Sequence, residues 1–278
     1  MRFGCGLELL VVIVAVIQCI GFIITYILAA YYGHLTPFFP YISNTGGKPP
    51  ESCIFTLICS ISSIIWLLII YIRYIQVKQY YQKDINRIKF LNQFTFFIGA
   101  VSVFGLLLVG SFQDHNVNAK VHMIGAFTLW IFGILHMWFQ TLVSYKIYHT
   151  GLTRRIDKVN IFGRLIISLM AVIISIIGLI SMKVSEQQRV HKEGQYDPFY
   201  WDSSVVGYPL HLTSTISEWC LGLTFVLFFL TFHVDFYRAS LNVSFVSPTQ
   251  SQEEQVSVSM NKEPLNERTP LVAVLNSN

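Results

Sequence analysis

The sequence predicts an all-α, multi-pass membrane protein built as a bundle of six transmembrane helices. Of its 278 residues, 53% are apolar and only 12% are charged, about half the charged fraction of an ordinary soluble domain. The mean hydropathy is +0.54. Six apolar stretches are each long enough to cross a hydrocarbon layer of about 30 Å. A soluble enzyme is excluded, because a chain of this size still exposes about a quarter of its surface to water.

The six predicted spans share a continuous apolar composition without an internal proline. They are residues 7–31, 53–74, 90–111, 121–145, 161–182 and 215–237. Each must be helical, because only intrahelical hydrogen bonds satisfy the backbone of such a segment inside a bilayer. The first apolar stretch is about twice as long as the core of a signal peptide, so we expect it to remain as the first helix. One membrane domain therefore covers residues 1–238.

The distribution of Lys and Arg predicts the orientation of the bundle. The connections after the second and fourth spans and the two termini carry fourteen of the 19 basic residues, and the opposite side carries five. Cytosolic loops are the ones that accumulate Lys and Arg. Both termini are therefore expected in the cytosol, where the sequon Asn242-Val243-Ser244 would stay unmodified.

Residues 239–278 are predicted to form a disordered cytosolic tail. This segment is rich in Ser, Gln, Glu and Asn, a composition that buries too little apolar surface to offset the entropy of ordering. Within it, Glu267 lies four residues before the aliphatic pair Leu271-Val272. The pattern resembles an acidic dileucine sorting signal, which binds adaptor proteins through a charge and an aliphatic anchor. The second position holds Val where such signals have Leu.

The connection between the first two spans combines many turn-forming residues with aromatic residues. The turn formers are Pro37, Pro40, Gly46, Gly47, Pro49 and Pro50, and the aromatic residues are Phe38, Phe39 and Tyr41. Proline and glycine fix or permit specific turn conformations. This connection is therefore expected to be an ordered cap over one end of the bundle.

A few ionisable and polar residues near the same end could form a collar around the helix mouths. Glu218 lies one turn into the sixth span, His122 begins the fourth, and Gln113 follows the third. One interpretation is a pH sensor, a ligand site or a transport site, because histidine titrates near pH 6.5. The alternative is an interhelical hydrogen bond that only orients packing. Glu51, at the start of the second span, is expected to stabilise that helix through its dipole.

Motifs for catalysis and cofactor binding are missing from the sequence. There is no phosphate-binding glycine loop, nucleophile elbow, paired-histidine zinc helix or closely spaced cysteine pair. We therefore expect no enzyme activity, no cofactor and no metal. The basic residues lie near membrane edges, so no nucleic-acid partner is expected.

The residues resemble those of the DRAM (damage-regulated autophagy modulator) family, which is part of a superfamily that includes the Frag and Sfk types. The segment from Pro37 to Phe55 is similar to the extracytosolic signature of the family, and further similarity includes Arg73, Glu218-Trp219 and Asp235. The signature positions are Pro37, Phe38, Pro40, Tyr41, Ser43, Thr45, Gly46, Pro49, Pro50, Glu51 and Ser52. The tail is similar to that of the lysosomal member with a dileucine signal.

The resemblance implies a non-enzymatic membrane protein of lysosomes or late endosomes that promotes autophagy and influences cell death. Its expected partners are membrane lipids, adaptor proteins that bind the tail, and unidentified components of the autophagy machinery. One alternative is a transporter or channel for a solute or protons that uses the collar. Another is an organiser of membrane lipid that recruits phosphoinositide machinery through basic residues such as Lys78, Lys83, Arg87 and Lys89.

Overall fold

The computed structural model describes residues 2–3, 6–79, 85–113, 119–149, 158–194, 196–237, 239–243 and 256–260. Its helices are α1 (Leu7–Tyr31), α2 (Glu51–Lys78), α3 (Ile85–Ser111), α4 (Ala119–His149), α5 (Lys158–Glu193), α6 (Tyr208–Leu230) and α7 (Phe232–Phe236), with a 3-10 turn at Ser43–Gly46. Six segments are long and apolar enough to cross a membrane, with α6 and α7 forming the last. The predicted fold class is therefore confirmed.

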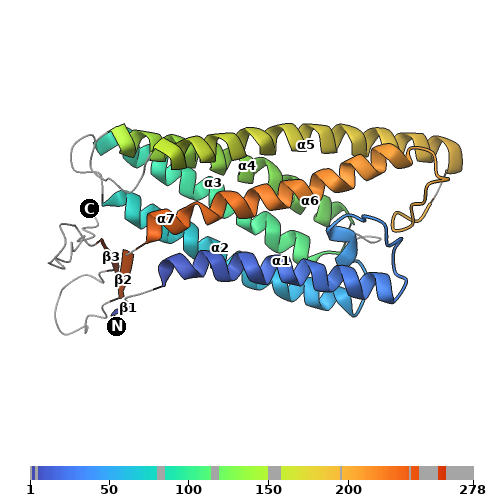
Figure 1. Cartoon of the computed structure of the whole chain (residues 1–278), viewed down its shortest axis with the longest axis horizontal. Coiled ribbons are helices and arrows are strands. Elements are labelled where there is room, and N and C mark those ends of the chain that lie inside the picture. The colour runs from blue at the N-terminus through green and yellow to red at the C-terminus, as the bar shows by residue number, and fades with distance from the viewer. Residues whose placement is uncertain are drawn as a thin grey trace.

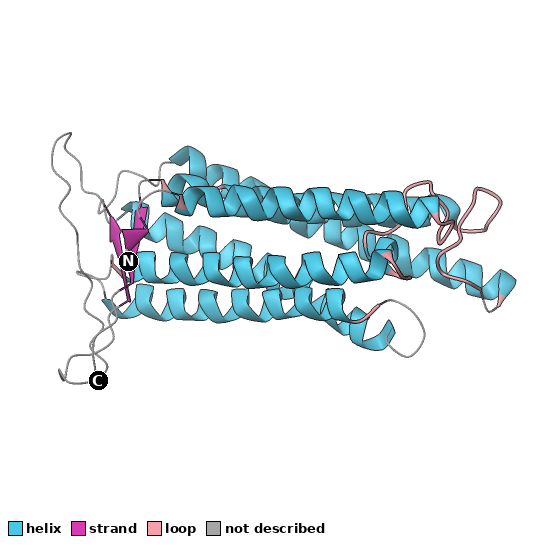
Figure 2. Cartoon of the chain, turned by 90° about the horizontal axis from the view of Figure 1, so that it is seen from below, coloured by secondary structure: helices cyan, strands magenta, loops and turns pink. Residues whose placement is uncertain are grey.

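The helices run parallel to one long axis and close into a bundle (Figure 1). Each of the first six helices packs against the next one in the chain, and α6 and α7 pack against α1. The strands lie at one end, which we call the terminal end, and the connections 32–50 and 194–207 lie at the other, the loop end (Figure 2). Helices that follow one another in the chain are therefore neighbours in space.

Three short strands form an antiparallel sheet at the terminal end, in the order β1 (Arg2–Phe3), β2 (Ala239–Val243) and β3 (Val256–Met260). Apolar and polar residues alternate in β3, a pattern typical of strands. β2 and β3 lie within the segment expected to be a disordered tail. The other tail residues lie outside the described part of the chain, so disorder there stays a prediction.

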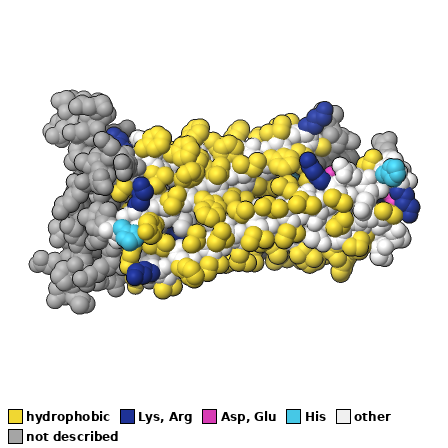
Figure 3. Space-filling model, turned by 90° about the horizontal axis from the view of Figure 1, so that it is seen from above, with side chains coloured by type: hydrophobic (Ala, Val, Ile, Leu, Met, Phe, Trp, Pro, Cys, Tyr) yellow, Lys and Arg dark blue, Asp and Glu magenta, His cyan; other side chains and the backbone are white. Residues whose placement is uncertain are grey.

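The surface of the bundle is apolar along its length and charged toward its ends, as a surface that contacts a bilayer must be. Apolar side chains cover the visible face along most of its length, and the basic side chains on this face lie toward its two ends (Figure 3). Ile64 on α2 and Ile180 on α5, for example, expose 70% and 60% of their surface. Apolar groups at mid-bundle gain from contact with lipid, whereas charged groups there would lose their hydration.

Helices α5 and α6 extend farthest beyond their predicted spans. Helix α5 continues from Met182 to Glu193, and α6 begins at Tyr208 instead of residue 215. Apolar composition ends near Met182, but the polar residues that follow still favour a helix, and Arg189 Nε donates to Glu193 Oε2 at 2.9 Å within one turn. The connection expected over 183–214 therefore spans only 194–207. It begins at Gly194 and ends at Gly207, which have φ angles of +73° and +86°.

A buried ionic network joins four helices at the terminal end. Arg164 Nη2 donates to Asp235 Oδ2, and Arg73 Nη1 lies 3.4 Å from the same oxygen. Arg164 also donates through Nε to Thr231 Oγ1 at 2.8 Å and through Nη1 to Ser144 Oγ at 2.6 Å. Arg73 and Arg164, counted above among the charges of the connections, are instead almost fully buried. Asp235 favours their burial, because its carboxylate lies against both guanidinium groups and offsets one of the two positive charges.

The α3–α4 contact depends on close backbone approach at glycine. A Cβ atom on Gly105 would lie 2.5 Å from Leu129 N and 2.8 Å from Gly125 O. Neither backbone atom can move without moving helix α4. The two helices can therefore reach their observed separation only with glycine at residue 105.

Asp235→Asn is expected to destabilise the bundle strongly. The substitution leaves two buried guanidinium groups without a carboxylate, a change that costs about 3–5 kcal/mol. We expect a much lower midpoint of thermal unfolding, measured by tryptophan fluorescence of the purified protein. Glu193→Gln removes a partly exposed carboxylate paired with Arg189, and it should change stability by less than about 1 kcal/mol. Equal losses in the two variants would contradict this role of Asp235.

Gly105→Ala and Gly163→Ala should have opposite effects on stability. Alanine at 105 forces the backbones of α3 and α4 apart, an overpacking cost of about 1–3 kcal/mol. A Cβ atom at Gly163 on α5 meets nothing within 4 Å, so alanine there should stabilise the helix by about 0.5–1 kcal/mol. Thermal unfolding of the two variants measures both effects, and a neutral Gly105→Ala would show that the helix contact is not tight.

Candidate functional site

Residues 32–50, which we call the cap, fold over the loop end and are anchored by side chains of two transmembrane helices. Tyr26 Oη of α1 donates to Pro37 O at 2.6 Å, and Trp219 Nε1 of α6 donates to Pro40 O at 2.9 Å. The backbone N–H of Ile42 donates to Glu218 Oε2 at 2.9 Å. Backbone groups of the cap that face the bundle are thus satisfied by residues distant in sequence.

The central part of the cap is fixed by small and hydroxylated residues. Thr45 Oγ1 donates to Ile42 O at 2.7 Å and lies 2.9 Å from Thr25 Oγ1 of α1. A Cβ atom on Gly46 would lie 2.3 Å from Cγ of the Phe55 ring. The Tyr41 hydroxyl lies 2.5 Å from Ser214 Oγ of α6, and burial raises the pKa of Tyr41. The phenol therefore stays neutral and serves as a hydrogen-bonding group.

Glu51 has a second role besides starting α2. It is fully buried, and its Oε1 lies 2.5 Å from Nδ1 of His34, which belongs to the cap. The carboxylate therefore links the first turn of α2 to the beginning of the cap as well as contributing to the helix dipole.

The connection 194–207 packs against the cap through aromatic residues. Thr36 exchanges hydrogen bonds with this segment, from its N–H to Phe199 O and from Trp201 N–H to its Oγ1, both at 3.1 Å. The Arg189 guanidinium lies 4.4 Å from the centre of the Trp201 ring, and that ring stacks on His211 at 4.0 Å. Sequence reasoning missed this cluster, for which the concentration of aromatic residues from 196 to 201 was the available signal.

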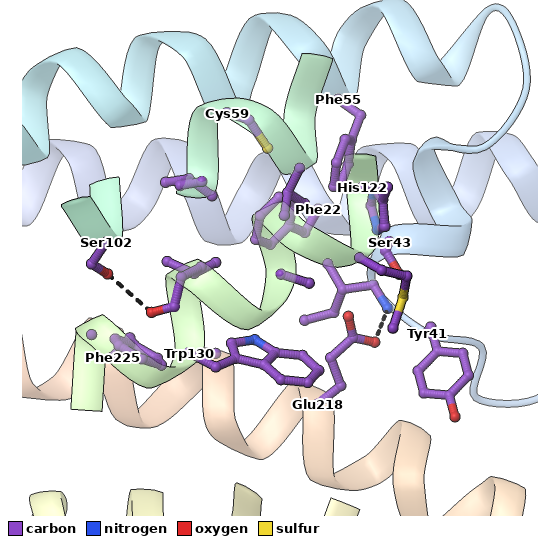
Figure 4. A pocket seen from close by; sticks show the side chains of 18 of the residues that line it. Phe22, Tyr41, Ser43, Phe55, Cys59, Ser102, His122, Trp130, Glu218 and Phe225 are labelled. Carbon is purple, nitrogen blue, oxygen red and sulfur yellow. Dashed lines mark hydrogen bonds between the residues drawn. The ribbon is translucent and has the colours of Figure 1, made fainter. Parts of the chain in front are cut away.

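A cavity of about 180 Å³ lies beneath the cap and is lined by side chains from each of the helices α1 to α6. Figure 4 shows Glu218, Trp130, Tyr41 and His122 near its capped side and Ser102 and Phe225 farther along it. Most of its wall is apolar or aromatic. A concave apolar cavity with a few polar groups is the usual form of a small-molecule site.

The predicted collar is only partly assembled at this cavity. Glu218 and His122 both line it, and His122 Nδ1 donates to Phe112 O at 2.7 Å. Glu218 lies ten residues into α6, not one turn, because that helix begins earlier than expected. Gln113 is half-buried and does not line the cavity, and it is the last residue described before the gap at 114–118.

Tyr41 and Ser43 of the signature segment line the cavity, and the other signature positions belong to the cap or to the first turn of α2.

Polar residues also reach the deep half of the cavity. His136 on α4 donates through Nδ1 to Thr95 O on α3 at 3.0 Å, and its ring stacks on Phe229. Its Nε2 is buried without a hydrogen-bond partner in the described part of the chain. Trp66 Nε1 donates to Gln18 Oε1 at 2.9 Å. His136 therefore forms an interhelical hydrogen bond and leaves its Nε2 without a partner among the described residues.

The remaining expectations concern metal sites and the tail. Within the described ranges, no group of three or more His, Cys, Asp or Glu side chains could hold a metal ion. Glu267, Leu271 and Val272 lie outside the described residues. The sorting signal therefore stays a prediction from the sequence.

Comparison with known proteins identifies relatives along the whole membrane domain. The chain is 35% identical over 225 residues to "DNA damage-regulated autophagy modulator protein 1" of Xenopus laevis, covering 81% of this chain and 88% of that protein. It is 31% identical over 246 residues to "DNA damage-regulated autophagy modulator protein 2" of Bos taurus, covering 87% and 88%. No solved structure matches the chain.

The family model described as "Frag1/DRAM/Sfk1/Cwh43P N-terminal domain" matches residues 6–239. This range begins one residue before α1 and ends at the first residue of β2, so it includes the cap, the cavity and the buried ionic network. The chain therefore belongs to the Frag1/DRAM/Sfk1 family.

Proposed function

We propose that this chain is a membrane protein of lysosomes or late endosomes that promotes autophagy and influences apoptosis without catalysing a reaction. The observation that carries the proposal is the 35% identity to a protein named as an autophagy modulator, which extends over 81% of the chain. The cap and the helices that anchor it lie within the matched family region. The relatives are named as modulators and not as enzymes, in line with a role in recognition.

We place the terminal end in the cytosol and the loop end in the lumen. Fourteen basic residues belong to the terminal side of the bundle by sequence, against five on the loop side. Arg73 and Arg164 are buried among the fourteen, and the other twelve still form the excess that cytosolic segments carry. The tail with Glu267, Leu271 and Val272 would then be accessible to adaptor proteins. The cap would face the lumen, beside the lipids and the proteins of the organelle.

The cavity bears on the alternative of a transporter or channel. Toward the terminal end, the cavity is followed by the buried rings of Phe228, Phe232 and Phe236, and Arg73 and Arg164 lie over the Phe232 ring at 5.9 and 5.0 Å. A channel needs a polar path through this region. The packing favours a binding pocket that is closed at the terminal end.

The alternative of a lipid organiser depends on the basic connection between α2 and α3. Lys78 and Lys89 lie at the ends of these helices, whereas the side chains of Lys83 and Arg87 lie outside the described residues. The modulator role therefore has the broader support, because the family match covers the entire bundle.

Replacing the aliphatic pair of the tail should change the location of the protein in the cell and lower autophagic flux. We expect Leu271→Ala/Val272→Ala to shift a tagged chain from lysosomes to the plasma membrane, because the adaptor loses its aliphatic anchor. Autophagic flux after starvation should fall with it, measured in cells that lack the endogenous protein. Val274→Ala/Leu275→Ala removes the same residue types three positions later and should change neither. If the intact chain is never lysosomal, the proposed location is wrong.

Asp202→Asn should report the orientation of the loop end. The substitution places a glycosylation acceptor two residues before Ser204, in the exposed connection between α5 and α6. We expect a mass increase that a glycosidase removes, because the modifying enzyme acts only in the lumen. The native sequon at Asn242 should remain unmodified in the same chain. Modification at Asn242 would instead place the termini in the lumen.

A further inference from the structure

The cavity beneath the cap is long and narrow. Its lining on α4 extends from His122 to His136, fourteen residues apart, which correspond to about 21 Å at the rise of an α-helix. On α6 it extends from His211 to Phe229, about 27 Å by the same rise. A ligand that fills this space must therefore be an elongated molecule.

The middle of the cavity is suited to a hydrocarbon chain. Its wall there is formed by residues such as Val103 and Leu106 of α3 and Phe225 and Phe229 of α6. Apolar cavities of this kind stay dry and bind apolar molecules. A hydrophilic solute would lose its hydration along most of the length.

The capped side of the cavity is suited to a cationic group. Glu186 and Glu218 supply two carboxylates, whereas no Lys or Arg lines the cavity within the described part of the chain. Aromatic rings surround the same region, with Trp130 and Tyr41 beside Glu218 (Figure 4). Ammonium groups are stabilised by carboxylates and by the faces of aromatic rings. Arg189 lies against the Tyr196 and Trp201 rings of this wall, but its guanidinium is paired with Glu193, so the glutamates still favour a cation over an anionic head group.

The deep end offers an independent sign of a ligand. Because His136 Nδ1 donates to Thr95 O, the neutral ring presents Nε2 as an acceptor. This nitrogen is buried without a described partner, in a side chain that is 3% exposed and lines the cavity. Buried acceptors in proteins nearly always receive a hydrogen bond, so a donor on the ligand would complete the site.

We propose that the cavity binds a single-chain amphiphile with an amine head, which places its ammonium group at Glu218 and its hydrocarbon chain toward His136. A hydroxyl group at the far end of the chain would donate to His136 Nε2. This site does not depend on the cellular pathway proposed above, because it is defined by the side chains of the bundle alone. A purified protein can therefore test it separately.

The test is photolabelling of the full chain in nanodiscs with a long-chain amine that carries a diazirine in mid-chain. We expect labelled peptides from α4 and α6 that contain Trp130 and Phe225, and protection by excess dodecylamine. Dodecanoate, with the same chain length and the opposite charge, should protect at least about tenfold less well. An amino alcohol with a terminal hydroxyl should protect better than dodecylamine, and this advantage should disappear in His136→Phe.

Variants separate the cavity from the lipid surface. Glu218→Gln keeps an acceptor for Ile42 N–H but removes the charge, so labelling should fall about tenfold. Gly222→Leu should abolish it, because Gly222 lines the cavity and the nearest atom to its Cβ position is 3.4 Å away, which leaves room for a side chain that fills the space. Glu193→Gln, a carboxylate outside the cavity, should label normally. Thermal unfolding checks that each variant is folded.

Two results would overturn the proposal. The first is labelling confined to lipid-facing peptides, such as those with Ile176 and Ile180 of α5. The second is equal protection by dodecylamine and dodecanoate on the unmodified chain, a comparison that requires no variant to fold. Loss of lysosomal location or of autophagic flux in cells would leave both readouts unchanged.

Discussion

The ionic network of Arg164, Asp235 and Arg73 is the constraint that the rest of the bundle must satisfy. Two guanidinium groups are buried among apolar rings, and one carboxylate from the last span lies against both. An unpaired charge there would cost several kcal/mol. Helices α2, α5 and α7 can therefore adopt only arrangements that bring these three side chains together, and Ser144 adds α4 to the same network through Arg164.

The loop end satisfies a different requirement, which is the hydrogen bonding of an irregular segment that lies on transmembrane helices. Side chains of α1 and α6 meet this need by accepting from or donating to the cap backbone. The two ends are thus held by polar contacts between segments far apart in sequence. The cavity lies between them, where side chains do not fill all of the space that α1 to α6 enclose.

Sequence reasoning predicted the spans and the cap because both depend on local composition. Apolar runs fix the six helices, and turn formers from Pro37 to Pro50 indicate an ordered segment. The buried network was missed, because Arg73, Arg164 and Asp235 lie at the ends of apolar runs where water usually solvates charges. Glu218 and His122 were identified from the sequence as polar residues near one end of the bundle. The cavity itself could not be predicted, because it is lined by six helices and no single helix carries a sequence pattern for it.

The order of the helices around the bundle has a consequence for biogenesis. Each helix packs on its predecessor, and closure against α1 requires α6 and α7. Arg73 and Arg164 therefore precede Asp235, the carboxylate that lies against both of them, in the order of synthesis. The two guanidinium groups can therefore gain this carboxylate only once the last span has joined the bundle, so assembly of the terminal end is coupled to completion of the membrane domain.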